Sequence, residues 1–121
     1  NAGNVLDDHV IGSMEYAVEH LHAPLIIVVG HEKCGAVSAT VSGAEAPGHI
    51  RSVVESIAPA FEKSKSQPGD KVDNAVRANA QQTADILKQA EPILKESQSA
   101  GHLSIVAARY DLGTGRVEIL K

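Results

Sequence analysis

The sequence predicts an α/β fold with a mainly parallel sheet, flanked by helices and closed by an antiparallel hairpin at its C-terminal edge. Two β-branched apolar runs, at residues 25–29 and 103–110, indicate strands, and amphipathic patterns before and between them indicate helices. A turn rich in glycine then leads to an alternating run at 116–120, as in an edge hairpin. With 121 residues, the chain is expected to form a single domain, 1–121.

Composition excludes several classes of function. The net charge is −4 and the charges are interspersed, so we expect no nucleic-acid partner. The apolar runs are far shorter than the roughly 20 residues that span a bilayer, so we expect a soluble protein with no membrane partner. Cys34 is the single cysteine, which excludes an internal disulfide and favours a reducing, cytoplasmic location.

The N-terminal third is predicted to be a helix followed by a buried strand. Apolar residues at three- and four-residue spacing indicate a helix over 10–21, with Asp8 or Ser13 as its cap. The run at 25–29 lacks alternation, so we expect a strand covered on both faces. Gly30 is then predicted to let the backbone turn sharply.

The rest of the chain alternates helices with polar connections. Small residues at 35–42 predict a helix that Gly43 ends, and Pro59 should shorten or bend the helix predicted at 50–61. A polar connection at 63–70 precedes the longest pattern. The remaining expected elements are a helix at 72–90, a kink or new helix at Pro92, and the strand at 103–110.

His31 and Cys34 form the candidate metal pair. Imidazole and thiolate are donors that zinc favours, and a backbone turn lets residues three positions apart reach one ion. Two other interpretations use the same segment: a cysteine packed under the strand end, and an anion cradle at a helix N-terminus. The cradle lacks a Walker lysine and a Gly-x-Gly-x-x-Gly pattern, and a cysteine phosphatase would need arginine where Thr40 stands.

The motifs together resemble those of the β-class carbonic anhydrases. The central one is Gly30-His-Glu-Lys-Cys-Gly-Ala36, which follows a hydrophobic strand and the segment Ser13-Met-Glu-Tyr-Ala-Val18. The chain looks like the second half of such a protein, which the segment Asn1-Ala-Gly-Asn4 introduces. The closing hairpin of the family is similar to Ala107-Ala-Arg-Tyr-Asp-Leu-Gly-Thr-Gly-Arg-Val117. The resemblance covers essentially the whole chain.

This resemblance implies a zinc enzyme that interconverts carbon dioxide and bicarbonate, built as dimers or higher homo-oligomers. His31 and Cys34 match two of the three zinc ligands of the family, and Gly35 matches the glycine beside the substrate site. The upstream Cys-x-Asp-x-Arg motif, with the third ligand and the catalytic aspartate and arginine, has no counterpart here. The first strands of the family fold are also absent, so we expect an N-terminally truncated, partial domain.

Two ligands are too few for a catalytic zinc, which leaves three hypotheses. The parent protein, with its upstream segment, hydrates carbon dioxide while this chain alone is inactive. Alternatively, the chain is a non-catalytic carbonic anhydrase-like module for binding or assembly. In the third hypothesis, two copies pool His31 and Cys34 into one shared structural zinc. Missing strands would also expose an apolar sheet edge and face, from which we expect tight association.

Overall fold

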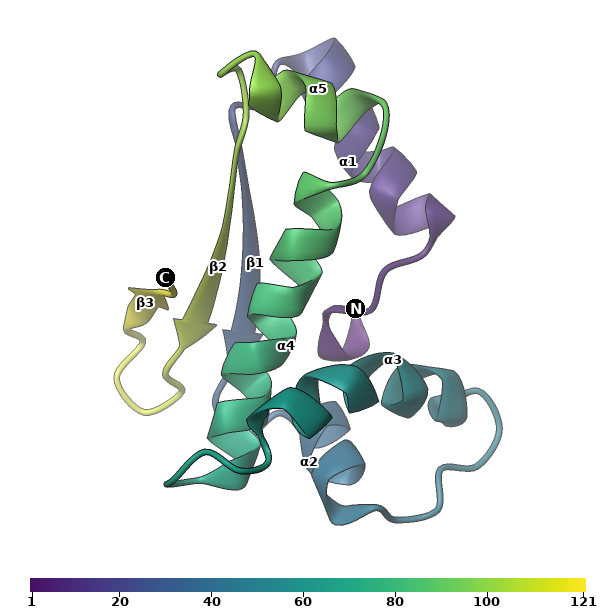
Figure 1. Ribbon diagram of the computed structural model, residues 1–121, viewed down its shortest axis with the longest axis vertical. Coiled ribbons are helices and arrows are strands. Elements are labelled where there is room, and N and C mark those ends of the chain that lie inside the picture. Colours follow the sequence, from purple (N-terminus) through teal and green to yellow (C-terminus); the bar gives the residue numbers. More distant parts are fainter.

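A three-stranded mixed sheet forms one layer of the computed structural model, which describes residues 1–121 (Figure 1). The strands are β1 (Leu25–His31), β2 (Ser104–Tyr110) and β3 (Val117–Ile119), in the order β1-β2-β3. β1 and β2 are parallel, with Leu25 opposite Ser104 and His31 opposite Tyr110, whereas β3 is antiparallel to β2. The predicted α/β fold with an antiparallel C-terminal hairpin is confirmed.

Helices form the rest of the molecule and surround one side of this sheet. They are the 3₁₀ turn η1 (Ala2–Asn4), α1 (Asp8–Leu21), α2 (Gly35–Ser42), α3 (Ile50–Ser64), α4 (Lys71–Lys88) and α5 (Ile93–Ser99). Gly43 ends α2 in a left-handed conformation, and a new helix begins after Pro92, as predicted. None of the helices combines the length and apolar composition needed to cross a bilayer.

Two helix predictions were wrong in detail. The cap of α1 is Asp7, whose carboxylate accepts the Val10 N–H at 2.8 Å, rather than Asp8 or Ser13. Pro59 was predicted to shorten or bend its helix, and the shortening is wrong, because the helix continues to Ser64. Proline removes one backbone donor there, but Ile57 and Ala60 are fully buried, and their packing holds the following turn in helical form.

The prediction that β1 is covered on both faces was wrong. Burial alternates along the strand: Val28 and Gly30 are buried, whereas Leu25, Ile27 and Val29 are 48%, 44% and 39% exposed. Helix α4 packs along one face of β1 and β2, and no helix covers the other face (Figure 1). A continuous apolar run therefore indicates the strand correctly but does not establish what covers it within this chain.

An open apolar face results, extending across all three strands. Residues paired directly across a ladder share a face, so β2 and β3 continue the exposed side of β1. The open face comprises Leu25, Ile27, Val29, Val106, Val117 and Ile119. β1 also has no partner on its outer edge, apart from the side-chain amide of Asn4, which donates to the Val29 carbonyl at 3.2 Å. An apolar face and edge of this kind favour association.

Helix α4 makes the closest approach to the sheet, at Gly30. A Cβ atom on Gly30 would lie 2.9 Å from Val76 Cγ1 and 3.3 Å from the Val76 carbonyl oxygen. Gly30 has no positive φ, so this glycine serves the contact between β1 and α4 rather than the sharp turn predicted for it.

This contact predicts a stability cost for Gly30→Ala. The new methyl group would force α4 away from β1, so we expect a loss of about 1–3 kcal/mol in the free energy of unfolding, measured by urea denaturation. Gly12→Ala is the matched control, because its Cβ would meet nothing within 4 Å inside α1. Here alanine should be neutral or stabilise by up to about 1 kcal/mol. If wild type and Gly30→Ala had the same midpoint of urea denaturation, the steric argument would be contradicted.

Candidate functional site

The turn from His31 to Cys34 connects the carboxyl end of β1 to the start of α2. His31 is the last residue of β1 and is exposed, while Cys34 precedes Gly35, the first residue of α2. The chain reverses at Lys33, which has a φ of 55°, a conformation that is uncommon for a residue with a side chain. Both predicted ligands thus lie on one short turn at the end of a parallel strand, where α/β folds commonly bind ligands.

Cys34 packs beneath this turn. It is 8% exposed and belongs to a small core cluster with Val37, Ile57, Ala75 and Val76, contributed by α2, α3 and α4. The structure therefore agrees with the packing interpretation of this cysteine. Metal binding by Cys34 is a separate property that this packing does not test, and it stays a prediction.

Hydrogen bonds tie the turn to the C-terminal hairpin. The Glu32 N–H donates to the Tyr110 carbonyl at 2.9 Å, and the Leu112 N–H donates to Glu32 Oε2 at 3.2 Å. The Nδ1 atom of His31 lies 2.8 Å from the Glu32 carbonyl oxygen, within hydrogen-bond distance. The loop that carries the candidate ligands is therefore held by the residues that follow β2.

The donor types of this turn fit zinc in kind but not in number. An imidazole nitrogen and a thiolate sulfur are ligands that zinc favours, whereas a catalytic zinc takes three protein ligands and keeps one open position. No group of three or more histidine, cysteine, aspartate or glutamate side chains in the structure is arranged so that it could hold a metal ion. His31 and Cys34 can therefore supply part of a zinc site.

Gly35 stands at the first position of α2 with free space around it. A Cβ atom there would meet nothing within 4 Å, and its φ is not positive. Neither the backbone nor the packing of this chain requires a glycine at this position. Its assignment to the substrate site stays a prediction.

A charged network lies beside the turn and joins α4 to the hairpin. Asp73 accepts from Arg109 Nε at 2.5 Å and from Arg77 Nε at 2.8 Å, and Arg77 also binds Glu118 with both terminal nitrogens at 3.1 and 2.8 Å. Partial burial raises the pKa of Asp73, but the hydrogen bonds from Arg77 and Arg109 outweigh it and hold this pKa below the usual range. Asp73 is therefore the ionised centre of the network.

The hairpin turn has its own carboxylate at its centre. Asp111 Oδ1 accepts from the backbone of Gly113 at 3.0 Å and from the backbone and hydroxyl of Thr114 at 2.8 and 2.9 Å. The backbone bond from Thr114, the largest influence, holds the pKa of Asp111 below its usual range. Arg109 Nη1 also donates to Asp111 Oδ2, at 3.4 Å.

Sequence reasoning missed Glu32 and the Asp73 network. The ion pair between Asp73 and Arg77 could have been predicted from the sequence, because opposite charges four positions apart on a helix lie next to each other. The pairing of Asp73 with Arg109 is 36 residues apart and has no local signal. Glu32 lies between the two predicted ligands, which was the one hint of its position.

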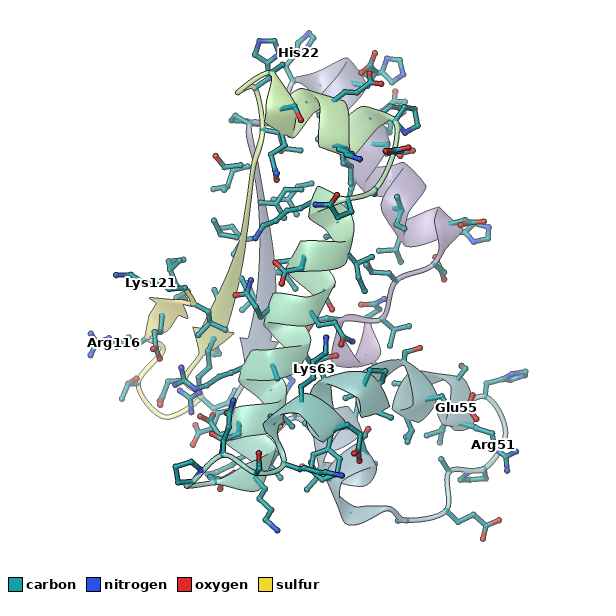
Figure 2. The ribbon with its side chains drawn as sticks, in the orientation of Figure 1. His22, Arg51, Glu55, Lys63, Arg116 and Lys121 are labelled. Carbon is teal, nitrogen blue, oxygen red and sulfur yellow. The ribbon has the colours of Figure 1, made fainter.

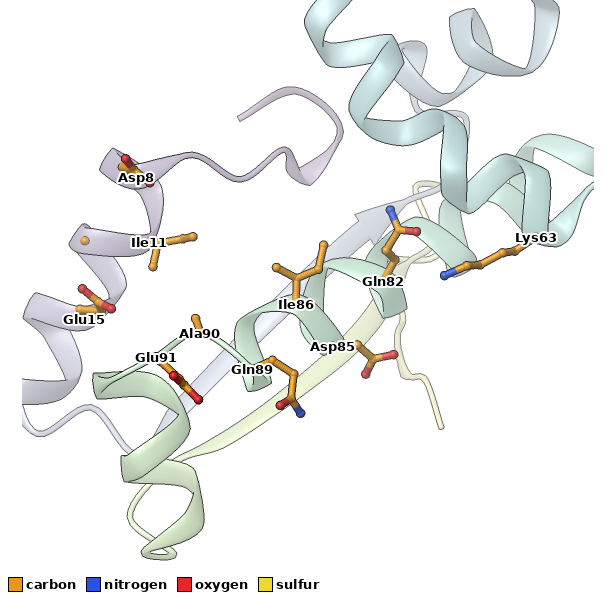
Figure 3. A pocket seen from close by; sticks show the side chains of 11 residues that line it. Asp8, Ile11, Glu15, Lys63, Gln82, Asp85, Ile86, Gln89, Ala90 and Glu91 are labelled. Carbon is orange, nitrogen blue, oxygen red and sulfur yellow. The ribbon is translucent and has the colours of Figure 1, made fainter.

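The largest cavity lies away from the turn. It has a volume of about 780 Å³ and opens between α1, α4 and the ends of α3 and α5, where Asp8, Glu15, Asp85 and Glu91 line it (Figure 3). A smaller hollow of about 410 Å³ lies beside the turn. It is lined by Glu32, Lys33, Ser38, Asp70, Val72, Asp73 and Arg109. The smaller hollow is the better candidate for a functional site, because it lies at the carboxyl end of a parallel strand and is lined by charged side chains.

The other histidines lie on the surface. His9, His20, His22, His49 and His102 are all exposed, and Figure 2 shows His22 at the end of the molecule opposite α2. The apolar pattern of the first helix predicts that Tyr16 packs in the core or at an interface. A core position is wrong for this chain, since Tyr16 is 61% exposed and its ring centroid lies 4.8 Å from that of His20.

Comparisons with known proteins show which family this chain is similar to. The carbonic anhydrase family model matches residues 1–117. Carbonic anhydrase from Mycolicibacterium smegmatis is 38% identical over 98% of this chain, and carbonic anhydrase 2 from Mycobacterium tuberculosis is 38% identical over 95%. The chain spans 59% and 58% of the length of these two relatives.

Solved structures show the same fold. A tetrameric β-carbonic anhydrase from Sordaria macrospora has a TM-score of 0.89 at 22% identity, covering 99% of this chain and 65% of the other. A β-carbonic anhydrase from Aspergillus fumigatus has a TM-score of 0.82 at 27% identity, covering 100% of this chain and 61% of the other.

The Asp73 network predicts how stability depends on pH. Because the folded-state pKa of Asp73 lies below its unfolded value, its contribution is complete above about pH 4 and is lost as pH falls through the folded pKa. Asp73→Asn should lower the free energy of unfolding by about 1–3 kcal/mol at neutral pH and flatten its fall below about pH 4.

The control is Asp85→Asn, which removes an exposed partner of Lys88. It should change stability by less than about 1 kcal/mol. Urea titrations at neutral and acid pH measure both effects. If the free energy of unfolding of Asp73→Asn varied with pH in parallel with that of wild type, Asp73 would not be the source of this pH dependence.

Proposed function

This chain belongs to the β-class carbonic anhydrase family, and on that premise we propose that the protein it represents catalyses the zinc-dependent, reversible hydration of carbon dioxide to bicarbonate. The family match over residues 1–117 carries this proposal. The His31–Cys34 turn at the carboxyl end of a parallel strand supports it, because it offers a nitrogen and a sulfur donor together.

In this proposal His31 and Cys34 hold the zinc, and Gly35 borders the carbon dioxide and bicarbonate site. Zinc in such a site acts as a Lewis acid and lowers the pKa of a bound water. Because this chain supplies two suitable donors, the third comes from a segment outside residues 1–121. The chain alone is then inactive, and no residue within it is assigned as a catalytic acid or base.

A non-catalytic module for binding or assembly is the second candidate. The specific observation in its favour is that no third histidine, cysteine, aspartate or glutamate completes a metal-binding group with His31 and Cys34 in this chain. Cys34 also has a packing role that would preserve it without a metal. Stoichiometric zinc together with carbon dioxide hydration in this chain alone would exclude this candidate.

We also propose that the protein is a homo-oligomer. The open apolar face and the unpartnered edge of β1 support association, and the relative from Sordaria macrospora is described as tetrameric. Two copies sharing His31 and Cys34 in one structural zinc is a special case of this proposal. The cytoplasmic location predicted from the sequence belongs to the proposal as well.

Metal content and activity test the proposed site. In a protein that includes the upstream segment, Cys34→Ser and His31→Ala should each lower zinc content and reduce carbon dioxide hydration by more than about 100-fold. Losing a metal ligand should cost more than the roughly 10–100-fold that follows from losing a hydrogen-bond partner of a ligand. His102→Ala removes an exposed histidine elsewhere and should change neither. Full zinc content in both site variants would reject these ligands.

Sedimentation velocity tests the association. Placing a charge on the open face by Ile27→Glu should shift the chain toward monomer, since Ile27 is 44% exposed at its centre. Ile50→Glu is the control, because Ile50 is 55% exposed at the start of α3, away from the sheet. A concentration-independent monomer for wild type would reject association through this face. If Cys34→Ser left metal content and oligomeric state unchanged, a shared zinc would be excluded.

A further inference from the structure

We propose that Glu32 is a positioning residue that holds the ring of His31 with Nδ1 protonated and Nε2 free to bind a metal. The proposal deepens the proposed function and rests on it, because it concerns the same turn. Three polar groups of Glu32 are engaged at once: its N–H, its carbonyl and its carboxylate.

The N–H of Glu32 continues the sheet beyond β1. It donates to the Tyr110 carbonyl at 2.9 Å, one residue past the pairing of His31 with Tyr110. The start of the turn is thus aligned by the same ladder that aligns the strands. This bond fixes the peptide on the N-terminal side of Glu32.

The carboxylate of Glu32 holds the turn to the hairpin. Oε2 accepts the Leu112 N–H at 3.2 Å, and the glutamate side chain is 26% exposed, so this contact is partly shielded from water. The hairpin is itself ordered by Asp111 and by Arg109, which is anchored on Asp73. Glu32 is therefore tied to a fixed support.

The carbonyl of Glu32 selects the state of His31. A carbonyl oxygen can only accept a hydrogen bond, so His31 Nδ1, at 2.8 Å, must carry the proton in the neutral ring. Nε2 is then unprotonated and offers its lone pair, which is the arrangement of a metal-binding histidine. Charged neighbours of the turn are Lys33, 4.0 Å from the Glu32 carboxylate, and the side chains of Asp70, Asp73 and Arg109, which line the adjacent hollow.

Lys33 explains why the turn needs this support. Its φ of 55° is costly for a residue with a side chain and persists only where the surroundings fix it. Without the carboxylate contact, the peptide between Glu32 and Lys33 can rotate, and its carbonyl then leaves His31. The side chain of Glu32 thereby acts on the ring through its own backbone.

Long-range ¹H–¹⁵N NMR of this chain reads the tautomer of His31 directly, from the coupling of each ring nitrogen to the ring protons. We expect the Nδ1–H form to dominate in wild type. In Glu32→Ala, the ratio of Nδ1–H to Nε2–H should fall about fivefold, as for the loss of one hydrogen bond. Glu32→Gln should keep the wild-type ratio, since its amide oxygen still accepts from Leu112.

Two outcomes would overturn the inference: a dominant Nε2–H form in wild type, or an unchanged ratio in a folded Glu32→Ala variant. The wild-type spectrum needs no variant, so the inference remains testable if Glu32→Ala fails to fold. His102 in the same spectra serves as the control, because it is exposed and remote in sequence from the turn. Failure of the proposed function would look different. The protein would then lack carbon dioxide hydration, while the tautomer ratio of His31 would still change in Glu32→Ala and not in Glu32→Gln.

Discussion

Close packing of α4 on the sheet is the contact on which the other parts of this structure depend. Gly30 allows it, and the fully buried alanines at 80 and 84, which pack in one cluster with Val28, Ile105 and Ala107 of the strands, keep the helix near β1 and β2. Both core clusters draw on α4, one toward α1 and α5 and the other toward α2 and α3. Polar side chains of the same helix hold the N-terminal turn, since Asn79 donates to the Gly3 carbonyl at 2.6 Å. A single helix thus organises both ends of the chain.

The candidate site combines a chemical part and a supporting part. Donor atoms are limited to His31 and Cys34, and both come from one turn. The support is far more extensive, because Glu32, the hairpin after β2 and the Asp73 network all brace that turn. Such bracing is what a metal ligand needs in order to keep its geometry, since loosely held ligands lose affinity.

Local patterns predicted the elements well, and non-local contacts set the limits of prediction. The helix break at Pro92, the end of α2 at Gly43 and both long strands follow from nearby residues. The burial of β1 does not, because the same apolar run suits a strand covered on one face or on two. Likewise, His31 and Cys34 are readable from their spacing and family motif, whereas the role of Glu32 depends on Leu112, which is distant in sequence.

The bond from Leu112 to Glu32 joins residues 80 positions apart, and this separation bears on how the molecule folds. Helices such as α4 form from neighbouring residues, whereas pairing β1 with β2 must close a long loop against chain entropy. The candidate site therefore takes shape only after the two ends of the chain have met. A metal bound at this turn would draw its affinity from the completed fold, and saturating metal would in return raise the free energy of unfolding.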